Sequence, residues 1–241
     1  MDLGIEGRVA LVVAGSRGLG RATAEALAAE GVKVMVSARN EASLAEVGEA
    51  IGSAGGTAAT TVADLADPAA PAMLVAATVE AFGTIDIVVA NSGGPPPGSA
   101  LELDDEQLDS ALNLNLLSAV RLVRESIPTM RAGGWGRICC ITSYSVVQPI
   151  PGLALSNTAR AGLWAWAKTA AQDLAREQSG ITLNLVCPGP HATDRMRELG
   201  GTGVMGRPHD FGQVVAFLCS EQAGFVNGAA VVVDGGATLA L

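Results

Sequence analysis

The stretch Arg8-Val-Ala-Leu-Val-Val-Ala-Gly-Ser-Arg-Gly-Leu-Gly-Arg21, continued to Arg39, decides the fold. Its apolar run Val9–Val13 is too short for a helix and predicts a strand. Glycines at positions 15, 18 and 20 form a turn, after which alanine and leucine at three-to-four spacing predict a helix that Gly31 ends. A second apolar run, Val32–Val36, completes one βαβ unit.

The glycines of this turn predict a phosphate-binding site. They let the backbone approach a pyrophosphate, which then lies against the free N–H groups and the positive dipole end of the helix. The residues that we expect to form the site are Gly15, Ser16, Arg17, Gly18, Leu19 and Gly20. The alternative is a tight turn whose glycines serve packing alone, because the spacing departs from the common G-x-G-x-x-G pattern.

Length, composition and charge indicate a globular protein that does not bind nucleic acid or anionic membranes. The chain has 241 residues, of which 49% are hydrophobic and 30 are glycine. A globular chain of this length buries roughly 70–75% of the surface that it exposes when unfolded. The formal net charge of −9 disfavours nucleic acid and anionic membranes as partners, because no basic field would hold their phosphates.

The N-terminal residues and the cysteines bear on the compartment. Residues 1–8 lack the charged segment and apolar core of a signal peptide, and no apolar run approaches the ~18–20 residues that span a bilayer. We therefore expect a cytoplasmic protein. The four cysteines, at 139, 140, 187 and 219, lie in apolar runs without C-x-x-C spacing, so we expect buried thiols and neither a metal site nor a disulfide.

Strands and helices alternate along the chain. The expected strands are Val9–Val13, Val32–Val36, Thr57–Val62, Ile85–Ala90, Gly136–Thr142, Ile181–Cys187 and Ala229–Val233. The helices expected after the first are Glu41–Ser53, Ala69–Phe82, Asp104–Arg131, Ser156–Gln178 and Asp210–Ser220. This alternation, without linkers or repeats, predicts a single α/β domain over residues 1–241, with a Rossmann-like, doubly wound, seven-stranded parallel sheet.

Ligands of such sheets bind beyond the carboxyl ends of the strands. Polar residues, glycines and prolines gather at those ends: Ser16 and Arg17, Arg39 and Asn40, Asp64, residues 91–93, Ser143 and Tyr144, and residues 188–191. The proline- and glycine-rich stretch Gly93–Gly98 forms a loop after the fourth strand. We therefore expect one binding site along this edge of the sheet.

Taken together, these segments resemble the short-chain dehydrogenase/reductase family, and within it the 3-oxoacyl-carrier-protein-reductase-like members, over essentially the whole chain. The matching segments are Ser16–Gly20, Asp64, Asn91-Ser92-Gly93, Asn115, Ser143, Pro188-Gly189 with Thr193, and Val233-Asp234-Gly235-Gly236. The resemblance implies a nicotinamide dinucleotide as cofactor and hydride transfer to or from a small carbonyl or alcohol substrate.

Three segments depart from the family's pattern. Members usually begin the glycine turn with Thr-Gly, where this chain has Val13-Ala14 and a glycine at 15. Members carry a Tyr 13 residues after the Ser and a Lys four residues later, where this chain has Ser156 and Arg160. Only residues 194–205 separate Thr193 from the turn at Gly206, so we expect a truncated helical substrate lid.

The resemblance also implies which residues contact the cofactor. Arg17 and Arg39 lie where the adenosine ribose would bind, and arginine there favours a 2′-phosphate, so we expect NADP(H) in preference to NAD(H). The alternative is that both are solvated surface arginines. Asp64 would accept a hydrogen bond from the adenine amino group or, alternatively, cap the next helix. The further implied contacts are Asn91, Gly93, Pro188, Gly189 and Thr193.

The catalytic roles that the resemblance implies are incomplete. Ser143 would hydrogen-bond the substrate carbonyl and Asn115 would hold a water for proton relay; the alternatives are a turn-forming serine and a solvent-facing or bend-forming asparagine. The phenol that would protonate the alkoxide is missing, and the hydroxyl of Ser156 is far too weak an acid to replace it. Arg160 could hold a ribose hydroxyl but cannot relay a proton.

Two other side chains could supply the proton. Tyr144, the only tyrosine, follows Ser143 at the mouth of the expected site. His191 lies in the loop after the sixth strand, and an imidazole suits acid–base work near neutral pH. The alternatives are a packed aromatic ring and a loop histidine without a catalytic role. We expect His209 to be a surface residue.

Two hypotheses of function follow. The favoured one is an NADP(H)-dependent oxidoreductase with a degenerate active site, and the alternative is a catalytically inactive dinucleotide-binding protein that acts as a sensor or a non-catalytic subunit. We also expect a homo-oligomer, a dimer or tetramer, because the helices at 104–131 and 156–178 carry apolar residues beyond what one sheet face can cover. The residues concerned are Leu163, Trp164, Trp166 and Leu174.

Overall fold

A parallel sheet of seven strands, in the order β3-β2-β1-β4-β5-β6-β7, forms the centre of the computed structural model, which describes residues 1–201 and 203–240. The strands are β1 (Val9–Val13), β2 (Lys33–Ala38), β3 (Thr57–Val62), β4 (Ile87–Ala90), β5 (Gly136–Ile141), β6 (Ile181–Pro188) and β7 (Ala230–Val233). The strand order turns back between β1 and β4, so the expected doubly wound α/β fold is confirmed.

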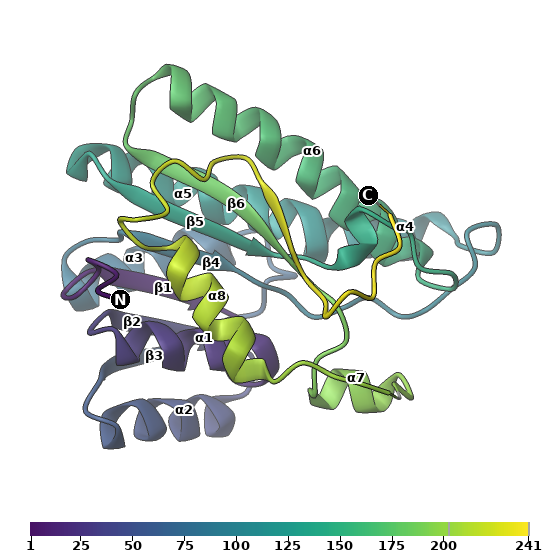
Figure 1. Cartoon of the computed structure of the whole chain (residues 1–241), viewed down its shortest axis with the longest axis horizontal. Coiled ribbons are helices and arrows are strands. Elements are labelled where there is room, and N and C mark those ends of the chain that lie inside the picture. The colour runs from purple at the N-terminus through teal and green to yellow at the C-terminus, as the bar shows by residue number, and fades with distance from the viewer. Residues whose placement is uncertain (202, 241) are drawn as a thin grey trace.

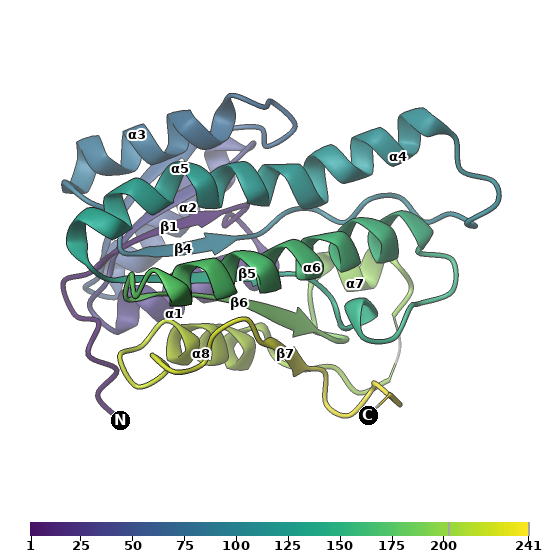
Figure 2. The ribbon, with the colours of Figure 1, turned by 90° about the horizontal axis from the view of Figure 1, so that it is seen from above.

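Helices cover both faces of the sheet (Figures 1 and 2). They are α1 (Gly18–Ala29), α2 (Glu41–Ser53), α3 (Ala70–Phe82), α4 (Asp105–Leu112), α5 (Ser118–Gly133), α6 (Ala154–Arg176), α7 (Asp194–Glu198) and α8 (Pro208–Leu218). The helices α3, α5 and α6 pack on one face, and α1, α2 and α8 pack on the other.

The apolar strands form because both of their faces are buried. Along β1, Leu11 and Val13 join the core under α3, α5 and α6, whereas Ala10 and Val12 join the core under α1, α2 and α8. Successive side chains of a strand point to opposite faces, so a strand covered on both sides carries an unbroken apolar run. Because all seven strands are parallel, their carboxyl ends lie along one edge of the sheet.

The helix expected over 104–131 is present but divided. A π-helical turn, Asn113–Leu117, separates α4 from α5. The turn is fixed by tertiary hydrogen bonds: the Nδ2 of Asn113 donates to the Ala66 carbonyl at 2.8 Å, and the Nη1 of Arg121 donates to the Oδ1 of Asn113 at 2.7 Å. Such turns are frequent at functional sites, and this one carries Asn115.

Two of the residues cited for an oligomer interface belong instead to the core. Leu163 and Leu174 are buried against the sheet, whereas Trp164 and Trp166 are half-buried and pack on the edge of the same core. The strand β6, α4 and the turn Asn113–Leu117 therefore cover more of α6 than its sequence suggested. The expected burial of all four cysteine thiols is confirmed. Among the described residues, no helix has the length and apolarity needed to cross a membrane.

Candidate functional site

The glycine turn after β1 is held by backbone contacts and one side chain. Ala14 has a φ of 49°, a left-handed conformation that costs alanine about 1 kcal/mol and that glycine adopts freely. The Nδ2 of Asn91, at the end of β4, donates to the Ala14 carbonyl at 3.1 Å. A Cβ at Gly20 would lie 2.5 Å from that carbonyl oxygen. Gly20 therefore permits close packing between the turn and α1.

The first turn of α1 has the properties of an anion site. Its N-cap residue, Arg17, makes no side-chain capping bond, and the turn contains no acidic residue. The free N–H groups and the helix dipole favour a negative charge there. The methyl group of Thr193 lies 3.5 Å from where a Cβ on Gly18 would be, so the loop after β6 approaches this turn. The residues present fit the pyrophosphate of a dinucleotide.

The residues expected around the adenosine lie at the same edge. Arg17 is exposed, with its Nη1 4.0 Å from the Oε1 of Glu198 on α7, and Arg39 is exposed just past β2. The Oδ1 of Asp64 accepts from the Ala66 N–H at 3.0 Å, so this carboxylate stabilises the turn that leads towards α3. A contact between Asp64 and adenine stays a prediction.

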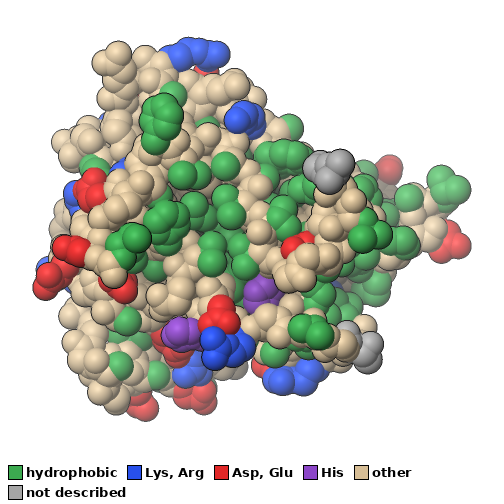
Figure 3. Space-filling view, in the orientation of Figure 1, with side chains coloured by type: hydrophobic (Ala, Val, Ile, Leu, Met, Phe, Trp, Pro, Cys, Tyr) green, Lys and Arg blue, Asp and Glu red, His purple; other side chains and the backbone are tan. Residues whose placement is uncertain are grey.

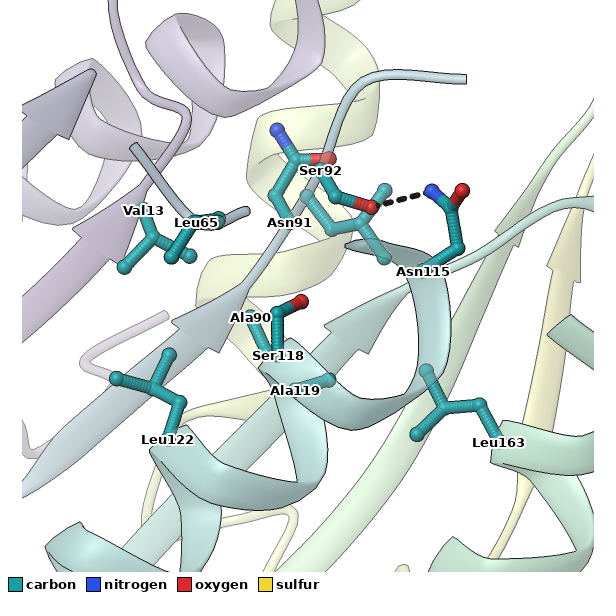
Figure 4. Close-up of a pocket in the computed structure, with 11 residues that line it drawn as sticks. Val13, Leu65, Ala90, Asn91, Ser92, Asn115, Ser118, Ala119, Leu122 and Leu163 are labelled. Atoms are coloured by element: carbon teal, nitrogen blue, oxygen red, sulfur yellow. Dashed lines mark hydrogen bonds between the residues drawn. The ribbon is translucent and has the colours of Figure 1, made fainter. Parts of the chain in front are cut away.

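Asn115 points into a small cavity beside the end of β4 (Figure 4). Its Nδ2 donates to the Oγ of Ser92 at 2.8 Å and to the Gly93 carbonyl at 2.7 Å. Its Oδ1 is buried and has no hydrogen-bond partner among the described residues. The cavity is about 10 Å³, room for one water, which the free oxygen could hold.

Ser143 and Tyr144 follow β5 directly. The Oγ of Ser143 accepts from the Ser145 N–H at 3.1 Å, so its own hydroxyl proton stays available to a ligand carbonyl. Tyr144 opens the short 3₁₀ helix Tyr144–Val146 and is half-buried. Both residues therefore lie at the carboxyl edge of the sheet, as their positions in the sequence predict.

Ser156 and Arg160 occupy one buried face of α6. The Nε of Arg160 donates to the Oγ of Ser156 at 3.1 Å, and its Nη1 donates to the Ile141 carbonyl at the end of β5 at 3.2 Å. Burial lowers the pKa of Arg160 to about 10; the nearby Cys187 opposes this shift and the charge of Arg195 adds to it. Arg160 is still a cation at neutral pH.

His191 and its neighbours form a tightly packed loop. The His191 ring is 5% exposed and meets the Phe211 ring of α8 edge-on, with centroids 5.2 Å apart. Its Nδ1 donates to the Gly189 carbonyl at 3.0 Å, which leaves Nε2 as the nitrogen able to exchange a proton. A Cβ at Gly189 would lie 2.6 Å from the Cα of Asp234, so glycine is needed after Pro188.

Arg195 is a site residue that the sequence analysis missed. It lies on α7, and its Nη2 donates to the carbonyl of Pro95 at 3.0 Å across the mouth of the site. The loop that it contacts reaches the start of α6 at Gly98, whose carbonyl accepts from the Ala154 N–H at 3.3 Å. The segment after Thr193 drew notice only because it is short. The signal that could have identified Arg195 is its charge, two positions after Thr193.

The fold and this site define a class of dinucleotide-binding α/β proteins. Residues 13–238 match the family described as enoyl-(acyl carrier protein) reductase. Among the relatives, 3-oxoacyl-(acyl-carrier-protein) reductase FabG of Escherichia coli is 32% identical, over 97% of this chain and 98% of its own. Human dehydrogenase/reductase SDR family member 4 is 30% identical, over 95% of this chain and 87% of its own.

A solved structure of a reductase is similar to this chain over its whole length. L-sorbose reductase from Gluconobacter frateurii, complexed with NADPH and L-sorbose, superposes with a TM-score of 0.93 at 29% identity and full coverage of both chains. The chain therefore belongs to the short-chain dehydrogenase/reductase family.

Proposed function

We propose that the protein is an NADP(H)-dependent oxidoreductase that acts on a small carbonyl or alcohol substrate, with a 3-oxoacyl-reductase-like site whose proton donor has changed. The observation that carries the proposal is the uncapped first turn of α1, placed beside Asn115 and Ser143 at one edge of the sheet. Such a turn holds a dinucleotide, and the two polar side chains can orient a carbonyl next to it.

The cofactor preference rests on Arg17 and Arg39. A guanidinium group at the end of β2 pairs with a 2′-phosphate, whereas the ribose 2′-hydroxyl of NAD(H) is usually bound by a carboxylate there. Pro188, Gly189 and Thr193 would contact the nicotinamide half, because their loop reaches Gly18. The NADPH bound by the Gluconobacter reductase supports the same assignment.

The cofactor preference predicts unequal thermal protection. At a concentration of 100 times its Kd, NADPH should add about 2.7 kcal/mol to the free energy of unfolding, and therefore raise the Tm by roughly 5–10 °C. NADH at the same concentration should protect less. Differential scanning fluorimetry of Arg39→Ala should remove the difference, and Arg124→Ala, on the exposed face of α5, should retain it. Equal protection of the wild-type protein by both cofactors contradicts the preference.

The hydrogen bonds at the carboxyl edge of the sheet support the catalytic roles that we propose. Ser143 donates to the substrate carbonyl, while the free Oδ1 of Asn115 holds a water that relays a proton. In this proposal Arg160 would hold a ribose hydroxyl of the cofactor with a guanidinium N–H. The proton for the alkoxide comes from that water, from Tyr144 or from the Nε2 of His191.

We also propose a homo-oligomer, a dimer or tetramer. Hydrophobic side chains gather on the face formed by α8 and the C-terminal segment (Figure 3), where Phe217 and Phe225 are exposed, and Leu117 is exposed beside α5. Light scattering at micromolar concentration should give a dimer or tetramer. Phe217→Glu and Leu117→Glu should identify which of the two faces associates, because a buried unpaired carboxylate opposes assembly. A monomer for the wild-type protein contradicts the proposal.

A further inference from the structure

The end of β4 is joined to two separate parts of the site through the side chains of neighbouring residues. The Nδ2 of Asn91 donates to the Ala14 carbonyl in the glycine turn at 3.1 Å. The Oγ of Ser92, the next residue, accepts from the Nδ2 of Asn115 in the π-helical turn at 2.8 Å (Figure 4). Ser92 has no role in the proposed function, although it contacts a residue that does.

The contact with Ser92 determines which way the side-chain amide of Asn115 faces. Both protons of the Nδ2 are used, one by the Oγ of Ser92 and the other by the Gly93 carbonyl at 2.7 Å. A carbonyl oxygen can only accept, so a reversed amide would place two acceptors against each other and lose both hydrogen bonds. The Oδ1 of Asn115 is therefore held in one orientation.

This Oδ1 is buried and free. Asn115 is 2% exposed, and no group of the described residues donates to its Oδ1. Ser92 and Asn115 line the same cavity of about 10 Å³, most of whose other lining side chains are apolar. A buried acceptor without a donor is costly, and an amide held by two hydrogen bonds cannot turn to relieve it. The arrangement therefore keeps one oxygen available for a water.

We propose that Ser92 is a positioning residue, whose hydroxyl orients the Asn115 amide so that its Oδ1 holds the water that protonates the alkoxide. The reaction in this role rests on the proposed function, whereas the orientation of the amide does not. The carbonyl carbon accepts a hydride from NADPH, which becomes NADP⁺, and the alkoxide oxygen takes a proton from this water, which is reprotonated by solvent. The proton then comes from neither Tyr144 nor His191.

The rate of NADPH oxidation with methyl acetoacetate, a 3-oxo ester, tests this role. Ser92→Ala removes the acceptor and should lower kcat roughly 3- to 10-fold, the effect of one hydrogen bond, with the KM for the ester and for NADPH unchanged. Ser92→Thr keeps a hydroxyl and should restore kcat. The matched control is Ser126→Ala, because Ser126 is a buried serine of α5 whose hydroxyl donates to the Leu122 carbonyl.

The solvent isotope effect separates positioning of the water from a structural role. The ratio of kcat in H₂O to kcat in D₂O should be larger for Ser92→Ala than for the wild-type protein, because proton transfer then limits more of the turnover. A general loss of packing at the end of β4 would lower kcat without this increase. Ser126→Ala should keep the wild-type ratio.

A further readout does not need turnover. The side-chain N–H₂ signals of Asn115 in the NMR spectrum can be identified by their loss in Asn115→Asp. These protons should exchange with solvent roughly 10-fold faster in Ser92→Ala than in the wild-type protein, since one of their two acceptors is gone. Ser92→Thr should restore the slow exchange.

The outcomes separate this inference from the proposed function. Faster amide exchange in Ser92→Ala, with no NADPH oxidation by the wild-type protein, would leave the orientation by Ser92 standing and refute the reductase function. Unchanged exchange, or an unchanged kcat and isotope effect in an active protein, would overturn the positioning role. A higher KM for the ester at unchanged kcat would assign Ser92 to substrate binding and overturn it too. So would loss of turnover in Tyr144→Phe or His191→Ala, which would identify another proton donor.

Discussion

The double substitution Ser156→Tyr/Arg160→Lys is expected to raise the rate of carbonyl reduction by NADPH roughly 100- to 10,000-fold, the contribution of a positioned general acid. Ser156 lies in the first turn of α6, with its Oγ beside the Nε of Arg160, so the two positions are already adjacent in space. A phenol there donates the proton, and the neighbouring lysine lowers the pKa of the phenol. NADPH absorbance against a panel of ketones, including a 3-oxoacyl thioester, measures the gain.

The matched control is Ser156→Phe/Arg160→Lys, which adds the same ring without a hydroxyl. The two double variants differ only in the phenol hydroxyl, so the Phe variant, which has no proton donor at this position, should stay at the wild-type rate. If the wild-type protein turns over and Tyr144→Phe or His191→Ala abolishes the reaction, the acid has moved to that residue. If neither the wild-type protein nor the double variant turns over while NADPH still binds, the reductase proposal fails and the protein is an inactive dinucleotide-binding protein.

The strands could be predicted from the sequence because burial on both sides imposes a continuous apolar run. The observed β1 and β3 have the expected bounds, whereas β4 begins at Ile87 instead of Ile85. Asp86 lies directly before β4, and its Oδ2 accepts from the Val9 N–H at 2.9 Å. This polar side-chain contact at the start of the strand could not be read from a run of apolar residues. The π-helical turn was not predictable, because the hydrogen bond from Asn113 to the Ala66 carbonyl joins residues 47 positions apart in sequence.

The site residues that follow directly on a strand could be predicted from the sequence. Asn91 and Ser143 lie at the carboxyl ends of β4 and β5, as the alternation of strands and helices requires. Burial and partners of charged side chains were not predictable. Nothing in a helical sequence shows that Arg160 turns back to the Ile141 carbonyl, or that Arg195 crosses to Pro95, because both contacts depend on how loops close over the sheet.

The substitution with the largest expected effect on stability is Gly212→Ala, where α8 crosses α1. A Cβ at Gly212 would lie 2.8 Å from the backbone carbon of Ala22, even closer to the carbonyl oxygen of that residue, and 3.2 Å from the Thr23 nitrogen. These are backbone atoms, so no side-chain rotation relieves the clash. The substitution should lower the free energy of unfolding by roughly 2–3 kcal/mol, the cost of overpacking at a rigid contact.

Gly52→Ala on α2 is the control, because a Cβ there meets nothing within 4 Å and replaces a helical glycine. It should raise the free energy of unfolding by about 0.5–1 kcal/mol, and urea denaturation of the two variants measures the opposite signs. The helix displaced in Gly212→Ala is the one whose first turn would hold the pyrophosphate, so NADPH should also protect this variant less than Gly52→Ala. Equal stability of both variants would mean that α8 can slide along α1 without cost, and that the phosphate-binding turn does not depend on this contact.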